Sequence, residues 1–524
     1  MADSTPATIQ GYDPRTGEPA GEPVPAADEA EVGRKVAAAR RAGPAWEALG
    51  PSGRAAALDA VADALDAHAA DLVDLADRET ALGRARLTGE VARTTGQLRL
   101  FAGLLREGGY LGLVREAAPA PIGAELVRLN RPIGPVAVFA ASNFPFAFSV
   151  AGGDTASALA AGCPVVVKAH EAHPHTALRT AELVTAALAA AGAPAGTFDL
   201  VFGFPAGGAL LRHPDLAAAG FTGSTRGGLA LAAICAARPV PIPFFGELGS
   251  VNPVFVLPGA ARSRRDEVAA GYAASLTQGV GQFCTNPGLM FVPDDQALLD
   301  AVGSAVAETV GGPMLAERIH AGYLAATASL TARDRVAVLA EGKPGEGPWS
   351  ATPQVFTTDV AAYGADREFL AEERFGPAGL VVRYRAGAGA GAGAGVGADA
   401  AAGANADASA NSDAAANAAV EALLATLEPA LTGDGQLTAT IQLDPSDPQD
   451  LLLARALVAR LRTLVGRIIY NGWPTGVAVN HAQHHGGPYP ATTAPAHTSV
   501  GAAAIFRWLI PVVHQGCPPE LAEF

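Results

Sequence analysis

A single cysteine at position 284 has neighbours that suit covalent chemistry on a carbonyl group. It lies in Gly-Gln-Phe-Cys-Thr-Asn at 281–286. Sulfur attacks carbonyl carbons well once the thiol has become a thiolate. Cys284 is therefore a candidate nucleophile, although an isolated cysteine is more often an inert, buried apolar side chain.

A carboxylate that could move protons lies 37 positions earlier, at Glu247 in Phe-Gly-Glu-Leu-Gly-Ser, 245–250. Apolar and glycine neighbours disfavour the charged form, so we expect the pKa of Glu247 to be raised towards neutrality. A carboxylate of that kind can act as a general base. The alternative is an exposed glutamate at the end of a strand.

An asparagine that could stabilise negative charge follows a short apolar run, in Ala-Ser-Asn-Phe-Pro at 141–145. A loop at the carboxyl end of a parallel strand is where α/β enzymes hold ligands. The Asn143 amide could donate hydrogen bonds to an oxyanion there. Taken alone, the residue could equally bond its own backbone in an ordinary loop.

A glycine-rich turn at 221–228, Phe-Thr-Gly-Ser-Thr-Arg-Gly-Gly, joins an extended piece to a helix. Backbone N–H groups at Gly223 and Ser224 would lie at the helix N-terminus, which suits a pyrophosphate. The simpler interpretation is a helix cap at Ser224 or Thr225.

The elements that must position these residues follow from the apolar pattern. Residues 26–106 show helical spacing. Short apolar runs then alternate with helical segments, which predicts a doubly wound parallel sheet. A second α/β stretch follows at 252–444. The predicted strands of the first sheet are 136–140, 164–168, 198–202, 220–222 and 241–248, and the helices between them are 149–161, 177–191, 206–212 and 225–236.

The segment 386–418 consists almost entirely of Gly, Ala, Asn, Ser and Asp. It lacks the large apolar groups that offset chain entropy. We therefore expect a mobile surface insertion with no functional role, between a strand at 380–383 and a helix at 420–427.

Length and composition exclude several classes of protein. A chain of 524 residues predicts two or three domains, and the net charge of −15 argues against nucleic-acid binding. The four cysteines are scattered, which argues against disulfides and thiolate metal sites. No stretch resembles a signal peptide or a membrane span, so we expect a cytoplasmic protein.

A histidine cluster in the loop at 481–485 is the only alternative that would bring in a metal. His481, His484 and His485 have no cysteine or acidic residue close by in the sequence. We therefore predict no metal site and a structural or subunit-contact role for these histidines.

Five motifs in this order resemble the aldehyde dehydrogenase superfamily over nearly the whole chain outside the insertion. They are Asn-Phe-Pro, Gly-Ser-Thr-x-x-Gly, Glu-Leu-Gly-Ser, Gly-Gln-x-Cys and, at 372–377, Glu-Glu-x-Phe-Gly-Pro. The resemblance implies a homodimer or homotetramer that oxidises an aldehyde with NAD or NADP through a cysteine thioester. It implies Cys284 as nucleophile, Glu247 as general base and Asn143 as oxyanion donor.

The same resemblance implies a set of cofactor-binding residues. Lys168 and Glu171 would hold the adenosine ribose. The pyrophosphate would lie at Gly223, Ser224 and Gly228, and the nicotinamide riboside at Glu373 and Phe375. The carboxylate of Glu171 favours NAD, because it would repel a 2′-phosphate.

The resemblance also implies a domain plan. We expect an NAD(P)-binding, Rossmann-like domain at 1–113 and 133–246 and an α/β catalytic domain at 247–487. The small oligomerisation extension would pair 114–132 with 488–502, and 503–524 would form a tail.

Two longer segments are similar to one branch of the superfamily, the α-ketoglutaric semialdehyde (2,5-dioxopentanoate) dehydrogenases. They are Ala-Ser-Asn-Phe-Pro-Phe-Ala-Phe-Ser-Val-Ala-Gly-Gly-Asp-Thr at 141–155 and Asn-Gly-Trp-Pro-Thr-Gly-Val at 471–477. Bacterial NADP-dependent fatty aldehyde dehydrogenases resemble this branch too, so the branch favours NADP, and an aliphatic aldehyde is the alternative substrate. No arginine near a motif is obviously placed to bind a substrate carboxylate.

Two further alternatives come from other classes of protein. A non-catalytic scaffold of the same fold would be free to lose Cys284 or Glu247, and both are present. A thiol hydrolase would normally use a histidine as base and would not need the turn at 221–228.

Overall fold

The computed structural model describes residues 7–385 and 405–521, which group into two compact units. Unit 1 comprises the described residues of Met1–Leu248, Val477–His485 and Thr493–Phe524, and unit 2 those of Gly249–Gly476 and Gly486–Thr492. Residues 477–485 thus group with the first unit and not, as predicted, with the segment 247–487. None of the helices in these ranges combines the length and apolarity that a membrane span needs.

Unit 1 begins with a two-stranded hairpin, β1 (Thr8–Ile9) and β2 (Val24–Pro25), and four helices that confirm the helical interpretation of 26–106. Asp28 caps the first helix, because its carboxylate accepts a hydrogen bond from the Glu31 backbone N–H at 2.7 Å. Gly108 ends the fourth in the left-handed conformation that glycine adopts easily. The helices are α1 (Glu29–Ala48), α2 (Gly50–Ala67), α3 (Ala69–Thr80) and α4 (Arg84–Glu107), and the short turn η1 (Gly109–Leu111) follows them.

A five-stranded sheet forms the centre of unit 1, and all of its strands are parallel in the order β7-β6-β5-β8-β9. The order reverses at β5, as a doubly wound fold requires, so the predicted fold class is confirmed. The strands are β5 (Val136–Phe139), β6 (Val165–Lys168), β7 (Phe198–Val201), β8 (Ala218–Thr222) and β9 (Phe244–Glu247), and the helices between them are α5 (Gly153–Ala161), α6 (Pro174–Ala190), α7 (Phe204–Arg212) and α8 (Thr225–Ala236).

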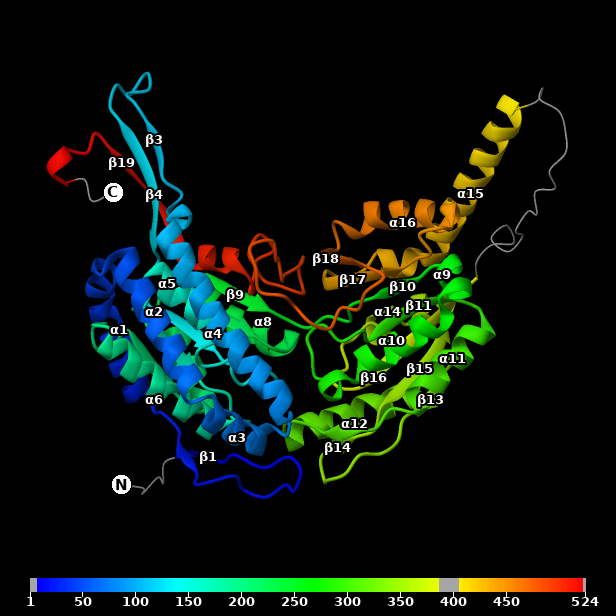
Figure 1. Ribbon diagram of the computed structural model, residues 1–524, viewed down its shortest axis with the longest axis horizontal. Helices are drawn as coiled ribbons and strands as arrows, with labels where there is room; N and C mark the ends of the chain where they lie inside the picture. The colour runs from blue at the N-terminus through cyan, green and yellow to red at the C-terminus, as the bar shows by residue number, and fades with distance from the viewer. Residues whose placement is uncertain (1–6, 386–404, 522–524) are drawn as a thin grey trace. The chain divides into compact units, whose positions relative to one another are not determined.

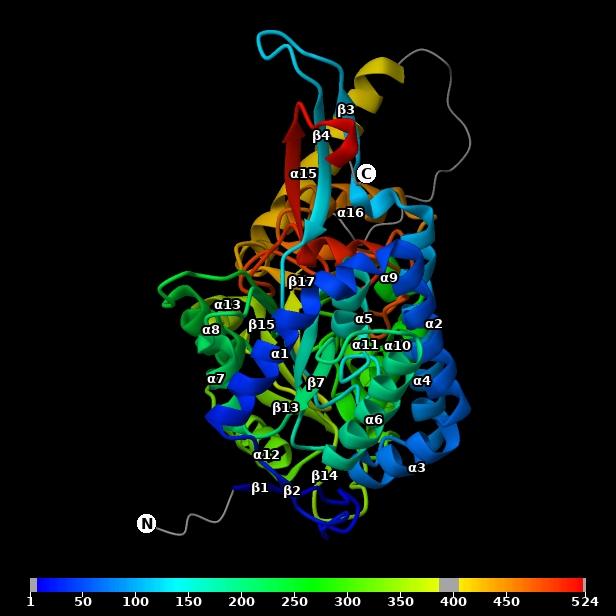
Figure 2. The same cartoon turned by 90° about the vertical axis from the view of Figure 1, so that its left-hand side faces the viewer.

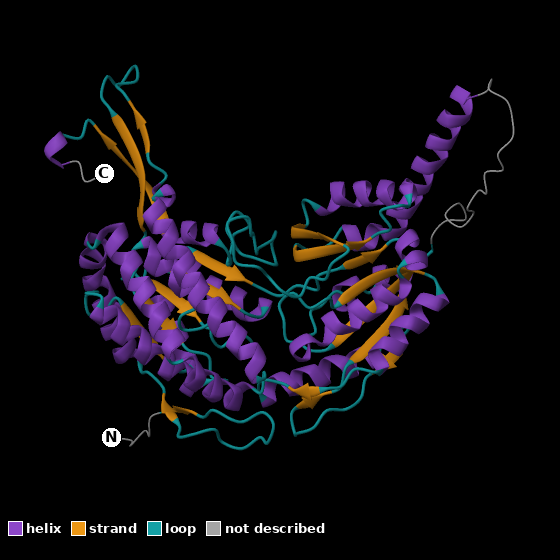
Figure 3. Cartoon of the chain, in the orientation of Figure 1, coloured by secondary structure: helices purple, strands orange, loops and turns teal. Residues whose placement is uncertain are grey.

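Alternate residues of these strands pack into two different cores. Val136 and Val138 lie in the core formed with α2, α4, α5 and α6, whereas Ala137 and Phe139 lie in the core formed with α1, α7 and α8. Both faces of the sheet are therefore covered by helices, as parallel sheets require. Figure 3 shows these helices flanking the strands.

A separate three-stranded antiparallel sheet, β19-β4-β3, extends from the same unit, as Figures 1 and 2 both show. It joins β3 (Val114–Glu116), β4 (Leu126–Pro132) and β19 (Leu509–Gln515). The predicted pairing of 114–132 with 488–502 is therefore wrong, because the strand that pairs with β4 lies within 503–524, the predicted tail. Prolines 488, 490 and 495 lack the N–H donors that a strand ladder needs, whereas β19 contains one proline and lies at a sheet edge.

Unit 2 is built on a seven-stranded sheet in the order β13-β15-β16-β11-β10-β17-β18, parallel except for β13. Phe255 and Phe291 pack with the helices on one face, and Val254 and Met290 with those on the other. The strands are β10 (Val254–Val256), β11 (Leu289–Pro293), β13 (Ala337–Glu341), β15 (Gln354–Asp359), β16 (Ala378–Tyr384), β17 (Gln436–Gln442) and β18 (Val465–Tyr470).

The helices of unit 2 cover this sheet, and a small two-stranded antiparallel sheet of β12 (Gly312–Pro313) and β14 (Ser350–Ala351) lies beside α12. The helices are α9 (Pro258–Ser263), α10 (Arg265–Thr277), α11 (Gln296–Ala307), α12 (Glu317–Thr331), α13 (Val360–Ala365), α14 (Arg367–Leu370), α15 (Asn405–Leu431) and α16 (Pro448–Leu461). Short turns complete the chain at η2 (Gln278–Gly281), η3 (Ala502–Trp508) and η4 (Pro519–Leu521).

Helix α15 begins at Asn405, inside the segment predicted to be a mobile surface insertion. Alanine is the strongest helix former and dominates this half of the segment, which accounts for the helix. Residues 386–404 of the insertion lie outside the described residues.

Candidate active site

The carboxyl ends of the strands of the first sheet collect four of the residues singled out in the sequence. Asn143 follows β5, Lys168 ends β6, Ser224 follows β8 and Glu247 ends β9. The strand order reverses between β5 and β8, and ligands of doubly wound sheets bind outside the strand ends at such a point. The sequence motifs of unit 1 thus meet at the edge of the sheet where the fold holds ligands.

Helix α4 holds the loop that carries Asn143. The Arg86 guanidinium donates to the Asn143 backbone oxygen at 2.6 Å. The Glu90 carboxylate accepts from the backbone N–H groups of Phe146 and Ala147 at 2.9 and 3.0 Å. Burial raises the pKa of Glu90, and the nearby charge of Arg86 opposes that effect. These contacts fix the backbone on which the Asn143 side chain, only 7% exposed, is mounted.

Lys168 and Glu171 form an ion pair through Nζ and Oε1 at the end of β6. Lys168 is buried and Glu171 is partly exposed. The carboxylate is therefore held next to a cation and is still accessible to a ligand. A carboxylate in this place can accept hydrogen bonds from ribose hydroxyls.

The N-terminus of α8 carries the three residues assigned to a pyrophosphate. Ser224 is the helix cap, since its hydroxyl accepts from the Gly227 backbone N–H at 3.2 Å. Gly223 and Ser224 are exposed, whereas Gly228 is buried. A Cβ on Gly228 would lie 2.1 Å from Leu248 Cδ2, so a larger residue would have to displace the Leu248 side chain. The turn therefore combines an exposed helix N-terminus with tight packing beneath it, which fits a dinucleotide phosphate.

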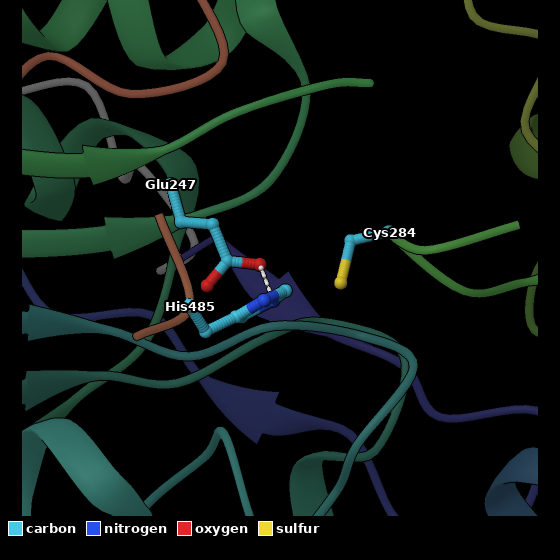
Figure 4. A group of neighbouring side chains, drawn as sticks. All are labelled: Glu247, Cys284 and His485. Carbon is cyan, nitrogen blue, oxygen red and sulfur yellow. Dashed lines mark hydrogen bonds and ion pairs between the residues drawn. The ribbon is translucent and has the colours of Figure 1, made fainter. Parts of the chain in front are cut away.

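Glu247 is buried and has two partners from the C-terminal part of the chain. The His485 imidazole Nε2 lies 2.9 Å from Oε1, and Figure 4 shows the ring directed at the carboxylate. The Ser499 hydroxyl donates to Oε2. All three side chains are less than 7% exposed. Both carboxylate oxygens are thus held in one orientation, as a general base requires.

The three histidines of 481–485 have different surroundings. His485 is occupied with Glu247, while His481 is exposed and His484 is partly buried. The motifs of the sequence did not show that His485 and Ser499 meet Glu247.

Cys284 follows η2 and precedes β11, in a loop whose backbone is held on several sides. Asn252 Nδ2 donates to the Cys284 backbone oxygen at 2.8 Å. Asn286 Nδ2 donates to the oxygens of Leu276 and Gly281 at 3.0 and 2.9 Å. Because its backbone is fixed by two buried amides, the Cys284 side chain starts from a defined position.

Strained backbone precedes the cysteine. Val280 has a φ of 59°, which is rare for a β-branched residue, and Gly281 has a φ of 65°. A Cβ on Gly281 would lie 2.3 Å from the Gly376 carbonyl carbon. The glycine therefore lets the cysteine loop pack directly on the segment of Glu373 and Phe375.

Glu373 and Phe375, assigned to the nicotinamide riboside, line one pocket of unit 2 together with Phe283, the neighbour of Cys284. The pocket brings the fourth and fifth sequence motifs together within this unit. Glu373 and Phe375 are partly exposed, so both can contact a ligand.

Two other cysteines, Cys163 and Cys235, differ from Cys284 in being buried. Burial raises the pKa of Cys163 to about 12 and that of Cys235 to about 11. Cys284 is partly exposed. Since the thiolate is the reactive form, Cys284 is better suited to nucleophilic attack than the two buried thiols.

Comparison with known proteins gives the same answer as the motifs. The family model "Aldehyde dehydrogenase family" matches residues 1–390. Alpha-ketoglutaric semialdehyde dehydrogenase 2 of Azospirillum brasilense is 43% identical, covering 98% of this chain and 92% of that protein. The alpha-ketoglutaric semialdehyde dehydrogenase of Acinetobacter baylyi is 40% identical, covering 88% and 82%.

A solved structure shows the same fold. Aldehyde dehydrogenase C of Pseudomonas syringae, a mutant in complex with NAD+ and octanal, aligns with a TM-score of 0.77 at 23% identity, covering 99% of this chain and 95% of that one. Together, the family match, the relatives and the fold show that this chain belongs to the aldehyde dehydrogenase family and is an NAD(P)-dependent aldehyde dehydrogenase.

Proposed function

We propose that this aldehyde dehydrogenase oxidises 2,5-dioxopentanoate, the semialdehyde of 2-oxoglutarate, to 2-oxoglutarate. The observation that carries this proposal is the 43% identity to alpha-ketoglutaric semialdehyde dehydrogenase 2 over 98% of the chain. The 40% identity to a second enzyme of that name supports it.

Steady-state rates over a panel of aldehydes test the substrate. The panel contains 2,5-dioxopentanoate, 4-oxobutanoate, pentanal and octanal, and the measurement is NAD(P)H absorbance. We expect kcat/KM for 2,5-dioxopentanoate to exceed that for octanal by about 100-fold or more, the range that one well-placed polar interaction gives. A higher kcat/KM for octanal would overturn the assignment in favour of an aliphatic aldehyde dehydrogenase.

In the proposed mechanism, Cys284 attacks the aldehyde carbon as a thiolate. A C–S bond forms, and the carbonyl oxygen becomes an oxyanion. We assign the Asn143 amide and the Cys284 backbone N–H as hydrogen-bond donors to that oxygen. The rigid mounting of the Asn143 backbone on α4 supports this role, because preorganised donors stabilise charge without reorganisation.

The oxidation itself needs a hydride acceptor, which bound NAD(P)+ supplies. We assign Lys168, Glu171, Gly223, Ser224, Gly228, Glu373 and Phe375 to holding it. The exposed N-terminus of α8 and the accessible Glu171 carboxylate support these assignments.

Glu247 completes the mechanism as the general base for hydrolysis of the Cys284 thioester. It would take a proton from water, and the resulting hydroxide would release the carboxylic acid. His485 and Ser499 support this role, because they hold the carboxylate in one rotamer.

We further propose a homodimer or homotetramer in the cytoplasm. The edge strand β19 supports an assembly, because Ile510, Val512 and Val513 are exposed apolar residues on it.

Cofactor choice depends on Glu171, and we predict a higher kcat/KM for NAD+ than for NADP+, with activity on both. Replacing Glu171 by threonine is expected to shift the ratio towards NADP+ by about tenfold, equivalent to ~1.4 kcal/mol of repulsion relieved. The substitution also removes the carboxylate that pairs with the Lys168 ammonium next to the ribose site. The measurement is kcat/KM for each cofactor at fixed ionic strength.

Glu182→Thr is the matched control, since Glu182 is an exposed glutamate on α6 that pairs with Arg179. It carries the same change of charge away from β6 and should leave the ratio unchanged. A wild-type enzyme that strongly prefers NADP+ would contradict the role assigned to Glu171.

A further inference from the structure

Strand β18 brings an arginine to the surroundings of Cys284. Arg467 pairs with Thr438 of β17, so the two side chains lie on the same face of the sheet. On that face the Thr438 hydroxyl donates to Asn252 Oδ1 at 3.0 Å. Asn252 in turn donates to the Cys284 backbone oxygen at 2.8 Å. Arg467 is thus next to a series of buried hydrogen bonds that ends at the backbone of Cys284.

The loop after β18 orients the guanidinium of Arg467. Nη1 donates to the Gly476 oxygen at 3.1 Å and Nη2 to the Pro474 oxygen at 2.7 Å. Both acceptors lie in Asn-Gly-Trp-Pro-Thr-Gly-Val at 471–477, one of the two segments similar to the α-ketoglutaric semialdehyde dehydrogenases. The motif therefore holds the head of Arg467 through its backbone carbonyls.

The loop itself is fixed on helix α10. The Thr475 and Ser275 hydroxyls are 2.8 Å apart, and the rings of Trp473 and Tyr272 pack with centroids 6.0 Å apart. A Cβ on Gly271 would lie 2.1 Å from Trp473 Nε1, so the indole fits against bare backbone. Such support restricts the rotamers of the arginine.

Arg467 carries a charge that the described protein does not neutralise. The side chain is half-buried, and no carboxylate of the described residues lies within ion-pair distance of it. Its Nε is buried and has no hydrogen-bond partner within the described ranges. Both hydrogen bonds it does make use neutral carbonyls.

The electrostatics agree with this placement. Burial lowers the pKa of Arg467, and the negative charge of a Cys284 thiolate opposes that effect. The guanidinium is thus near enough to the nucleophile to sense its charge. A half-buried cation without a counter-charge is unfavourable for folding, so a ligand that brings the opposite charge would stabilise it.

We propose that Arg467 binds the carboxylate of the substrate and so determines specificity for aldehydes that carry an acid group. The inference rests on the proposed function, in which the aldehyde end reacts at Cys284. Arginine has five N–H donors, and the two carbonyls of the loop use two of them. The remaining hydrogens of Nη1 and Nη2 can donate two parallel hydrogen bonds to a carboxylate, as planar guanidinium groups do.

Arg467→Gln tests the proposal when each charged aldehyde is compared with an uncharged one of equal chain length. The first pair is 2,5-dioxopentanoate and pentanal, and the second is 4-oxobutanoate and butanal. For the charged aldehydes, kcat/KM should fall by about 10- to 100-fold, mainly through KM, because a hydrogen bond to a charged group is lost. For the uncharged aldehydes it should change by less than about threefold.

The ratio within each pair is measured on one enzyme preparation, so it does not depend on the fraction that is folded. Arg467→Lys keeps the charge without the planar fork and should lose part of the discrimination. Arg460→Gln on α16 is the matched control, since Arg460 is partly exposed and pairs with Glu428. It should leave both ratios unchanged.

An equal loss of kcat/KM for charged and uncharged aldehydes would overturn the proposal. The substrate itself is tested separately in the wild type. A wild-type preference for 4-oxobutanoate would overturn the proposed substrate, while the second pair of aldehydes would still test Arg467.

Discussion

Replacing Cys284 by alanine is expected to abolish aldehyde oxidation, with kcat lower by about four orders of magnitude or more. Without the sulfur no covalent adduct forms, so the carbonyl carbon never reaches the tetrahedral state from which a hydride can leave. The backbone of the loop is held by Asn252 and Asn286 and not by the thiol, so the variant should fold normally. NAD(P)H formation and the melting temperature are the two measurements.

Cys235→Ala is the control for the loss of a thiol. Cys235 is buried in the core of unit 1, and its raised pKa keeps it protonated near neutral pH. The variant should keep wild-type kcat, with a modest loss of stability from the missing sulfur. Substantial activity in Cys284→Ala would contradict the covalent mechanism.

The first sheet was predictable because its signals are local. The β-branched run of β6 predicts a strand, and the alanine-rich segments around it predict helices, each from a few neighbouring residues. The pairing of β19 with β4 was not predictable in this way. Such a pairing joins residues far apart in the sequence, and several stretches of the chain could have supplied the third strand.

The same distinction applies to the candidate site. Asn143, Glu247 and Cys284 stand in short motifs, so one sequence was enough to name them. His485 and Ser499 lie 238 and 252 positions from Glu247, and their contact with it depends on the fold. Arg467 could not be identified from the sequence for a related reason. It stands four positions before the motif that holds it, and only the register of β17 and β18 relates it to Cys284.

Glu247→Gln is expected to separate the two halves of the reaction. Thiolate attack and oxidation do not need the base, so a rapid-mixing experiment should show a burst of about one NAD(P)H per active site. Hydrolysis of the thioester does need it, so steady turnover should fall by about 100-fold or more. Glutamine keeps the shape of the side chain and an oxygen that can accept from Ser499, so His485 and Ser499 should stay in place.

Hydroxylamine gives a second, independent measurement of the same step. It attacks thioesters without a general base, so it should restore turnover to Glu247→Gln and add little to the wild type. Glu267→Gln is the control, since Glu267 is a glutamate of α10 that pairs with Arg264 at the surface. If the burst disappeared in Glu247→Gln, the carboxylate would also be needed to form the Cys284 thiolate, and the division of roles between the two residues would be wrong.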